Sequence, residues 1–159
     1  MKPNILKVID VYPYKRDKNE IKFLLCLRSR TKVYGGQWRM IGGKIKENEL
    51  AWQAALREFN EETQMSPKLF WCVPSLNTYF DFKRNELLFI PAFAIEVDFE
   101  SEPILDDEHS AYVWIELDQL KKYPIWPEQE RIIKVIHEIL SNNHIVPDWI
   151  IQKNMYSRY

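Results

Sequence analysis

The apolar positions along the chain alternate between blocks with strand spacing and blocks with helix spacing. Segments rich in β-branched and aromatic residues predict strands at residues 5–14, 21–27, 69–82, 87–97 and 112–115. Residues 48–63 instead contain strong helix formers, and Pro127 opens a last helix whose apolar positions recur every three to four residues. Strands interrupted by one helix and closed by another predict an α/β fold with a mixed sheet covered on both faces.

The length and composition predict one domain. The chain has 159 residues, of which 46% are hydrophobic and 28% charged, enough for one core and too few for two comfortable ones. We expect a single domain over residues 1–143. The tail, residues 144–159, contains Trp149 and two tyrosines, and we expect it to pack on the domain or on a partner. It permits a homodimer without requiring one.

The charge balance excludes some classes of partner. With 22 basic and 23 acidic residues, no overall field would attract duplex nucleic acid or anionic lipid. The longest apolar stretch, residues 87–95, is far shorter than the roughly 20 residues that a bilayer-spanning helix needs, so no membrane partner is expected.

The N-terminus and the cysteines indicate the compartment. The first residues lack the apolar core and small-residue cleavage site of a signal peptide. Cys26 and Cys72 lie inside apolar runs, which predicts two buried reduced thiols rather than a disulfide. We therefore expect a cytoplasmic protein.

All four glycines fall between residues 35 and 43, as Gly35, Gly36, Gly42 and Gly43. Glycine lets something approach the main chain closely or lets the chain adopt conformations barred to other residues. This clustering marks one site.

The helix that follows the glycines has an acidic face. At 100° per residue, Trp52, Leu56 and Phe59 share a core face. A second stripe ends in Glu58 and Glu62, with Glu61 beside it. Like charges at this spacing repel, and a hard divalent cation such as Mg²⁺ or Mn²⁺ removes the repulsion. Taken alone, a Glu-rich helix is more often a solvated face.

The longer spacing favours the metal interpretation. Read as Gly43-x5-Glu49-x7-Arg57-Glu58-Phe59-x-Glu61-Glu62, the sequence resembles the signature of the Nudix hydrolases. The resemblance implies an α/β/α sandwich, with the mixed sheet flanked by the signature helix and the C-terminal helix. It also implies hydrolysis of a nucleoside diphosphate linked to another group. Gln64 stands where the family usually has glycine, which puts the end of the helix in doubt, since glycine there would serve as a left-handed cap.

The resemblance also implies roles for individual residues. Glu58, Glu61 and Glu62 resemble the metal ligands, with the carbonyl of Gly42 as a backbone ligand. Arg57 would orient Glu61, while Gly43 and Glu49 would be structural. A late-loop acidic residue usually completes such a site, and Glu108 is the best candidate, although its acidic run could equally be a solvated loop.

The chemistry of a phosphoanhydride suggests the remaining roles. Divalent ions would neutralise phosphate charge and activate a water, with Glu61 or Glu108 accepting its proton. Several groups near the glycine loop are candidates for holding the substrate: Arg28, Trp38, Arg39 and Lys44. Trp38, Tyr34, Tyr79 or Phe80 could stack on a base, although an aromatic residue in a strand is more often part of the core.

The sequence outside the motif favours one substrate class. Residues 51–58, 108–114 and 126–130 look similar to the branch that acts on dATP and dihydroneopterin triphosphate. We therefore expect a nucleoside or pterin triphosphate to be cleaved to the monophosphate and pyrophosphate. An enzyme that removes oxidised nucleotides is the alternative within the family. A non-catalytic nucleotide-binding module is the alternative of a different class.

Overall fold

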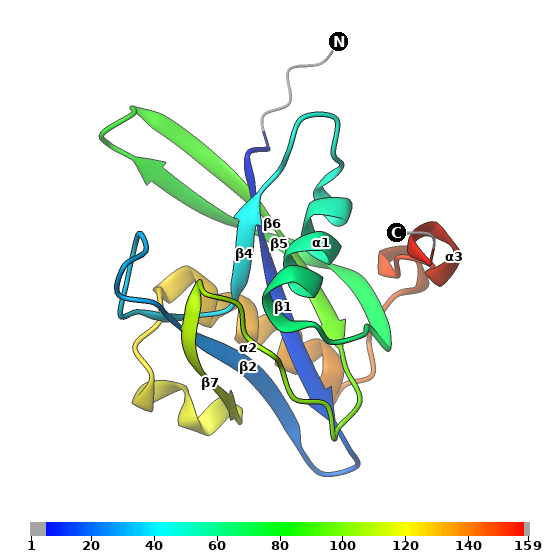
Figure 1. Ribbon diagram of the computed structural model, residues 1–159. Helices are drawn as coiled ribbons and strands as arrows, with labels where there is room; N and C mark the ends of the chain where they lie inside the picture. Colours follow the sequence, from blue (N-terminus) through cyan, green and yellow to red (C-terminus); the bar gives the residue numbers. More distant parts are fainter. Residues whose placement is uncertain (1–5, 158–159) are drawn as a thin grey trace.

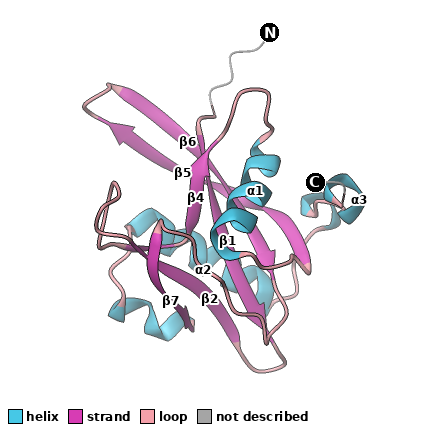
Figure 2. Cartoon of the chain, in the orientation of Figure 1, coloured by secondary structure: helices cyan, strands magenta, loops and turns pink. Residues whose placement is uncertain are grey.

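A seven-stranded mixed β-sheet forms the middle layer of the computed structural model, which describes residues 6–157 (Figure 1). The strands are β1 Val8–Arg16, β2 Ile21–Arg28, β3 Trp38–Arg39, β4 Ile41–Lys44, β5 Leu69–Asp81, β6 Glu86–Glu96 and β7 His109–Ile115. The helices are α1 Ala51–Thr63, α2 Pro127–Ser141 and α3 Lys153–Tyr156, with 3-10 turns η1 Leu117–Lys122 and η2 Pro147–Trp149. Figure 2 shows α1 and α2 on opposite sides of the sheet.

Strand β1 organises the sheet. It runs parallel to β6 and antiparallel to β2 and β4, and the main path is β3-β2-β1-β6-β5. Asp10 on β1 lies opposite Ala92 of β6 on one side and Gly42 of β4 on the other. The glycine pair is therefore fixed against the central strand.

The side chains of β1 alternate between two cores. Ile9 and Val11 face α1, where they pack with residues such as Phe59, whereas Tyr12 and Tyr14 face α2. A sheet with one helix on each face and a buried core on each side is the α/β/α sandwich that the sequence predicted, so the fold class is confirmed.

Helix α1 begins later than its composition predicts. The expected start at residue 48 fails because Asn48 has a left-handed backbone conformation, with φ 62°. The helix starts at Ala51 instead, after Leu50 as N-cap. The first strand begins at Val8 rather than residue 5, which lies outside the described residues.

The C-terminal end of α1 resolves the doubt about Gln64. Gln64 adopts the left-handed conformation itself, with φ 56° and ψ 18°, and its backbone N–H donates to the carbonyl of Asn60. The chain thus makes the turn that the resembling signature makes with glycine, using a residue for which that conformation is costly.

The prediction for the cysteines is half wrong. Both thiols are free, but only Cys26 is buried, and Cys72 is exposed. Strand β5 lies at the sheet edge, and α2 packs on it while α1 packs mainly on β1 and β4. Trp71 and Val73 face α2 and are buried. Cys72, between them, therefore points to the opposite face of the sheet, at a part of β5 that α1 does not cover.

Residues 144–157 of the tail lie along the outer edge of β5. The Ile151 N–H donates to the Phe70 carbonyl at 2.9 Å, and the Trp149 ring stacks on Trp71 with centroids 6.4 Å apart. Tyr156 packs against Phe70. Within residues 6–157, no helix has the length and apolar character needed to cross a bilayer.

Candidate active site

Helix α1 presents three glutamates in different environments. The Glu62 residue is 2% exposed, Glu58 is partly buried, and the Glu61 side chain is 53% exposed. Glu58 lies against Gly43, and Glu62 lies beside His109 at the start of β7. The acidic face that the sequence predicted therefore runs from solvent into the protein.

Arg57 links this acidic face to the glycine turn. Its Nη1 donates to Glu58 Oε1 at 2.6 Å and to Glu61 Oε2 at 3.3 Å. Its Nε donates to Glu49 Oε1 at 2.7 Å, and its Nη2 donates to the Lys44 carbonyl at 2.9 Å. The contact with Glu61 is the longest of these, so Arg57 fixes Glu49 and Glu58 more firmly than Glu61.

Glu49 fastens the start of α1. Besides the Arg57 contacts, its Oε2 accepts the backbone N–H of Lys46 at 2.9 Å. The hydrogen bond from Arg57 lowers the pKa of Glu49, and the Lys46 N–H acts in the same direction. Glu49 is therefore a charged tie between the glycine turn and the helix.

Glu62 is a buried carboxylate without a donor. Neither of its oxygens has a hydrogen-bond partner within residues 6–157. Burial, and then the charges of Glu58 and Glu108, raise its pKa to about 9. His109 Nδ1 is also unpartnered and lies 3.5 Å from Glu62 Oε2. An ionised carboxylate in this position needs a cation.

Glu108 reaches the same region from the loop before β7. Its Oε2 lies 2.5 Å from Arg28 Nη1, and its backbone carbonyl accepts the N–H of Ser29 at 2.8 Å. Its charge contributes to the raised pKa of both Glu58 and Glu62. The structure therefore brings Glu108 beside the acidic helix, and its part in completing a metal site stays a prediction.

Because the paired glycines have no side chains, other side chains approach their main chain from both faces of the sheet. A Cβ on Gly43 would overlap the Glu58 side chain. A Cβ on Gly42 would stand 3.2 Å from Asp10 Oδ1 and 3.7 Å from Arg39 Nη2. The main chain at this turn is thus closely approached by Glu58 from the α1 face and by Asp10 from the α2 face.

Residues 6–157 hold no preassembled group of three or more His, Cys, Asp or Glu side chains arranged around a metal position. Two of the carboxylates are paired with arginines instead of with a shared metal position: Glu58 with Arg57, and Glu108 with Arg28. The donor set nevertheless fits a hard divalent cation, since it is made of carboxylates and includes the unpartnered Glu62.

A family model described as the NUDIX domain matches residues 6–136. The chain belongs to the Nudix family. Nucleoside triphosphatase NudI of Klebsiella pneumoniae strain 342 is 27% identical over 116 residues, which cover 68% of this chain and 82% of that protein. NudI proteins of Escherichia coli match to the same extent.

Solved structures share the fold. The Ap4A hydrolase of C. elegans, in a binary complex, superposes with a TM-score of 0.71 at 21% identity, covering 86% of this chain and 98% of that chain. The dihydroneopterin triphosphate pyrophosphohydrolase of E. coli gives 0.66 at 20% identity, covering 83% and 98%. The family match and the NudI relatives make the protein a Nudix-type pyrophosphohydrolase, and the solved structures show the shared fold.

The four residues predicted to hold the substrate do not all gather at the Nudix helix. Arg28 is paired with Glu108, and Lys44 is exposed beside the glycine turn. Trp38 packs against Tyr123, with ring centroids 5.1 Å apart. Arg39 lies near Tyr34 and Trp126, with its guanidinium 5.9 Å and 5.8 Å from their ring centroids.

A buried polar cluster on the α2 face was not found by sequence reasoning. This Asp10 cluster consists of Asp10, Tyr12, Asn77 and Gln129, and of these the three nonaromatic residues are at most 4% exposed. Asn77 Nδ2 donates to Asp10 Oδ2 at 2.6 Å and to the Tyr12 hydroxyl at 3.0 Å. Burial raises the pKa of Asp10, opposed by the charge of Arg39. The one signal in the sequence for this cluster was Asp10, an aspartate among the apolar residues of a predicted strand.

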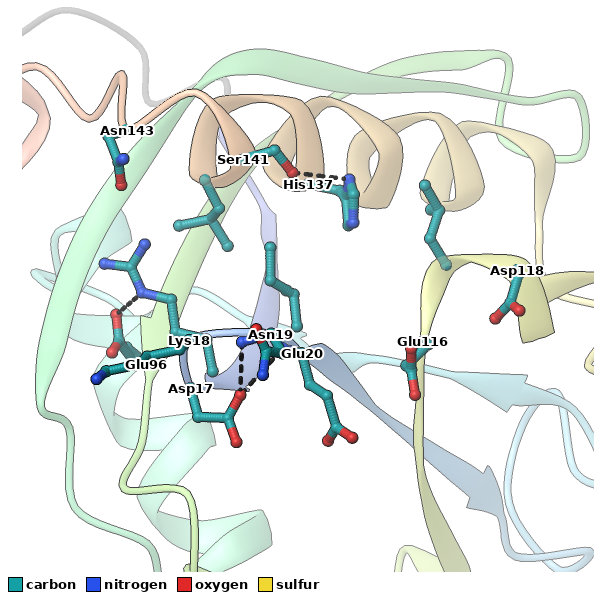
Figure 3. Close-up of a pocket in the computed structure, with 14 residues that line it drawn as sticks. Asp17, Lys18, Asn19, Glu20, Glu96, Glu116, Asp118, His137, Ser141 and Asn143 are labelled. Atoms are coloured by element: carbon teal, nitrogen blue, oxygen red, sulfur yellow. Dashed lines mark hydrogen bonds and ion pairs between the residues drawn. The ribbon is translucent and has the colours of Figure 1, made fainter.

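A hollow of about 900 Å³ lies elsewhere, between the β1–β2 turn, η1 and the C-terminal half of α2 (Figure 3). Figure 3 shows Asp17 and Glu20 of the turn below His137 and Ser141 of the helix. None of the Nudix motif residues lines it. The hollow is therefore separate from the candidate active site.

Proposed function

We propose that this protein hydrolyses a nucleoside or pterin triphosphate to the monophosphate and pyrophosphate, with Mg²⁺ as the metal and Mn²⁺ as a substitute. The observation that carries the proposal is the buried, unpartnered carboxylate of Glu62 beside Glu58 and the glycine turn. The NudI relatives are named nucleoside triphosphatases, which supports a triphosphate substrate.

Glu58 and Glu62 would hold the cation, together with Glu61, Glu108 and the Gly42 carbonyl. Bound there, the cation would neutralise phosphate charge and lower the pKa of a bound water. Arg57 keeps Glu58 in position through its 2.6 Å contact and anchors itself on Glu49. The site therefore has a buried ligand, a fixed ligand and more exposed carboxylates.

Two carboxylates are candidates for accepting the proton of the attacking water. Glu61 is largely exposed and has only the 3.3 Å contact with Arg57. Glu108 is held by Arg28, which gives it a defined position. Arg39 and Lys44 remain the candidates for phosphate contacts, because Arg28 is occupied by Glu108.

A pyrophosphate-release assay tests the proposal. The purified protein is incubated with Mg²⁺ and each of dATP, dGTP, 8-oxo-dGTP and dihydroneopterin triphosphate, and the products are separated. We expect monophosphate and pyrophosphate from at least one substrate. Selective cleavage of 8-oxo-dGTP would favour pool sanitation instead. No turnover of any member, with nucleotide binding retained, would favour a binding module.

The cytoplasmic location and the boundary of the domain at residue 143 stay predictions. So does the homodimer. Light scattering on the purified protein measures the last of these directly.

A further inference from the structure

The Asp10 cluster contains buried hydrogen-bond acceptors without donors. Asn77 Oδ1 and Gln129 Oε1 have no partner within the described residues, and both residues are 3% exposed. The Asn77 amide nitrogen already serves Asp10 and Tyr12, which fixes its oxygen as the free end. An unsatisfied buried acceptor is unfavourable, so these two oxygens are available to a donor from outside the described residues.

Aromatic side chains lie on the strand and at the helix end that carry Asn77 and Gln129. Tyr34 and Tyr79 both contact Trp126, with ring centroids 5.2 Å and 5.6 Å from it. We call these three rings, together with Arg39, the aromatic rim. Tyr79 follows Asn77 by two residues on β5 and so shares its face, while Trp126 caps the helix turn that contains Gln129. The rim and the acceptors therefore belong to the same corner of the α2 face.

The glycine turn connects this corner to the acidic helix. Gly42 has Asp10 and Arg39 against it on the α2 face, and its neighbour Gly43 has Glu58 against it on the α1 face. A triphosphate at the acidic helix would thus have the glycine turn, rather than bulky side chains, between it and the Asp10 cluster.

We infer that the Asp10 cluster and the aromatic rim select a bicyclic base that carries two adjacent N–H donors on one edge, as guanine and pterins do. The inference rests on the proposed function, because it assigns the base of the same substrate. The acceptors of Asn77 and Gln129 read the donor edge, and the rim rings stack on its faces. Adenine, which offers one amino donor beside an acceptor nitrogen, satisfies the pair less well.

Tyr34 packs edge-on against Trp126, and the two rings must separate for a base to stack between them. Tyr34 is 44% exposed and has φ 60°, an uncommon backbone conformation for tyrosine. Trp126 Nε1 donates to Gln37 Oε1 at 3.0 Å, which ties the loop of residues 29–37 to the start of α2. These contacts are replaceable by contacts with a base.

A pair of ligands that differ in one donor tests the inference without hydrolysis. Isothermal titration calorimetry compares GMP with IMP, which lacks the 2-amino group, and uses neopterin as a second carrier of the donor edge. We expect GMP or neopterin to bind at least about 10-fold more tightly than IMP. Gln129→Met removes one acceptor at similar volume, and Asp10→Asn changes the group that orients Asn77. Each should reduce the preference to about two-fold or less.

Tyr14→Phe is the matched control. Tyr14 lies on the same strand and face as Asp10 but bonds Glu96 and Trp71 outside the cluster, so its variant should keep the full preference. Thermal unfolding of each variant verifies folding, and the wild-type comparison requires no variant. Equal binding of the three ligands, or a preference unchanged in both cluster variants, would overturn the inference.

Kinetics separate this inference from the proposed function. If pyrophosphate is released with equal kcat/KM from dGTP and dITP, the function stands and the base assignment is wrong. If GMP or neopterin binds selectively and no triphosphate is hydrolysed, the base assignment stands and the function is wrong.

Discussion

Arg57 and the glutamates show how single residues determine the site. The sequence placed Arg57 beside Glu61, four residues away on the helix, whereas the structure gives its shorter contacts to Glu49 and Glu58. Helical spacing identifies neighbours on the same helix, but it does not include a partner eight residues away that precedes the helix. The role of Glu49 as a tie to the glycine turn was expected from the motif, and its bond to Arg57 was not.

The Glu49–Arg57 contact predicts a pH-dependent stability difference. The pKa of Glu49 lies below its ordinary value of 4.5, so its contribution to stability is present above that value and disappears as the pH falls through the lowered folded pKa. Glu49→Gln should lower the free energy of unfolding by about 2 kcal/mol at pH 7, and the difference should shrink toward pH 3. Urea unfolding at both pH values measures it.

Glu47→Gln is the control for that experiment, because Glu47 is exposed two residues away. It should change stability little at either pH. A Glu49→Gln penalty of the same size at pH 7 and pH 3 would show that the charge of Glu49 contributes nothing.

At the scale of elements, periodicity predicted more than local geometry did. The expected helix and strand segments all appear, because alternating and helical apolar patterns reflect which face is buried. The predicted start of α1 and the predicted burial of Cys72 were wrong, because each depends on a feature that the apolar pattern does not report. One depends on the backbone of Asn48, and the other on how far α1 extends over the sheet.

The C-terminal cap of α1 gives a stability prediction. The left-handed conformation costs a non-glycine residue about 1 kcal/mol, and Gln64 occupies it with φ 56°. Gln64→Gly should therefore be more stable than Gln64→Ala by about 1 kcal/mol, since alanine bears the same backbone cost as glutamine. Urea midpoints of the two variants measure this, and equal midpoints would show that the cap carries no strain.

At the scale of the whole molecule, the sheet separates two kinds of chemistry. The Nudix helix provides carboxylates on one face, and the Asp10 cluster provides uncharged acceptors on the other. The sequence predicted the first because its residues are close together in the chain. It could not predict the second, because Asp10, Asn77 and Gln129 come from β1, β5 and α2 and meet only when the sheet and its helix layer form.

The tail contributes to the stability of the fold. The stacking of Trp149 on Trp71 covers the edge strand, so Trp149→Ala should lower the free energy of unfolding by about 2 kcal/mol. Activity per folded molecule should not change, because the tail lies along β5, away from the Nudix motif. Denaturant unfolding and an activity assay measure both effects, with the exposed neighbour change Asp148→Ala as control. An unaltered unfolding midpoint would contradict the packing role.

The most direct test of the central claim is the turnover of Glu58→Gln and Glu62→Gln in the Mg²⁺-dependent pyrophosphate-release assay. Each substitution keeps the volume and removes the charge that would hold the cation. We predict that kcat falls about 100-fold or more in both variants, while Glu47→Gln keeps full activity and all three proteins unfold cooperatively. Turnover close to that of the wild type in both variants would contradict the assignment of the metal site.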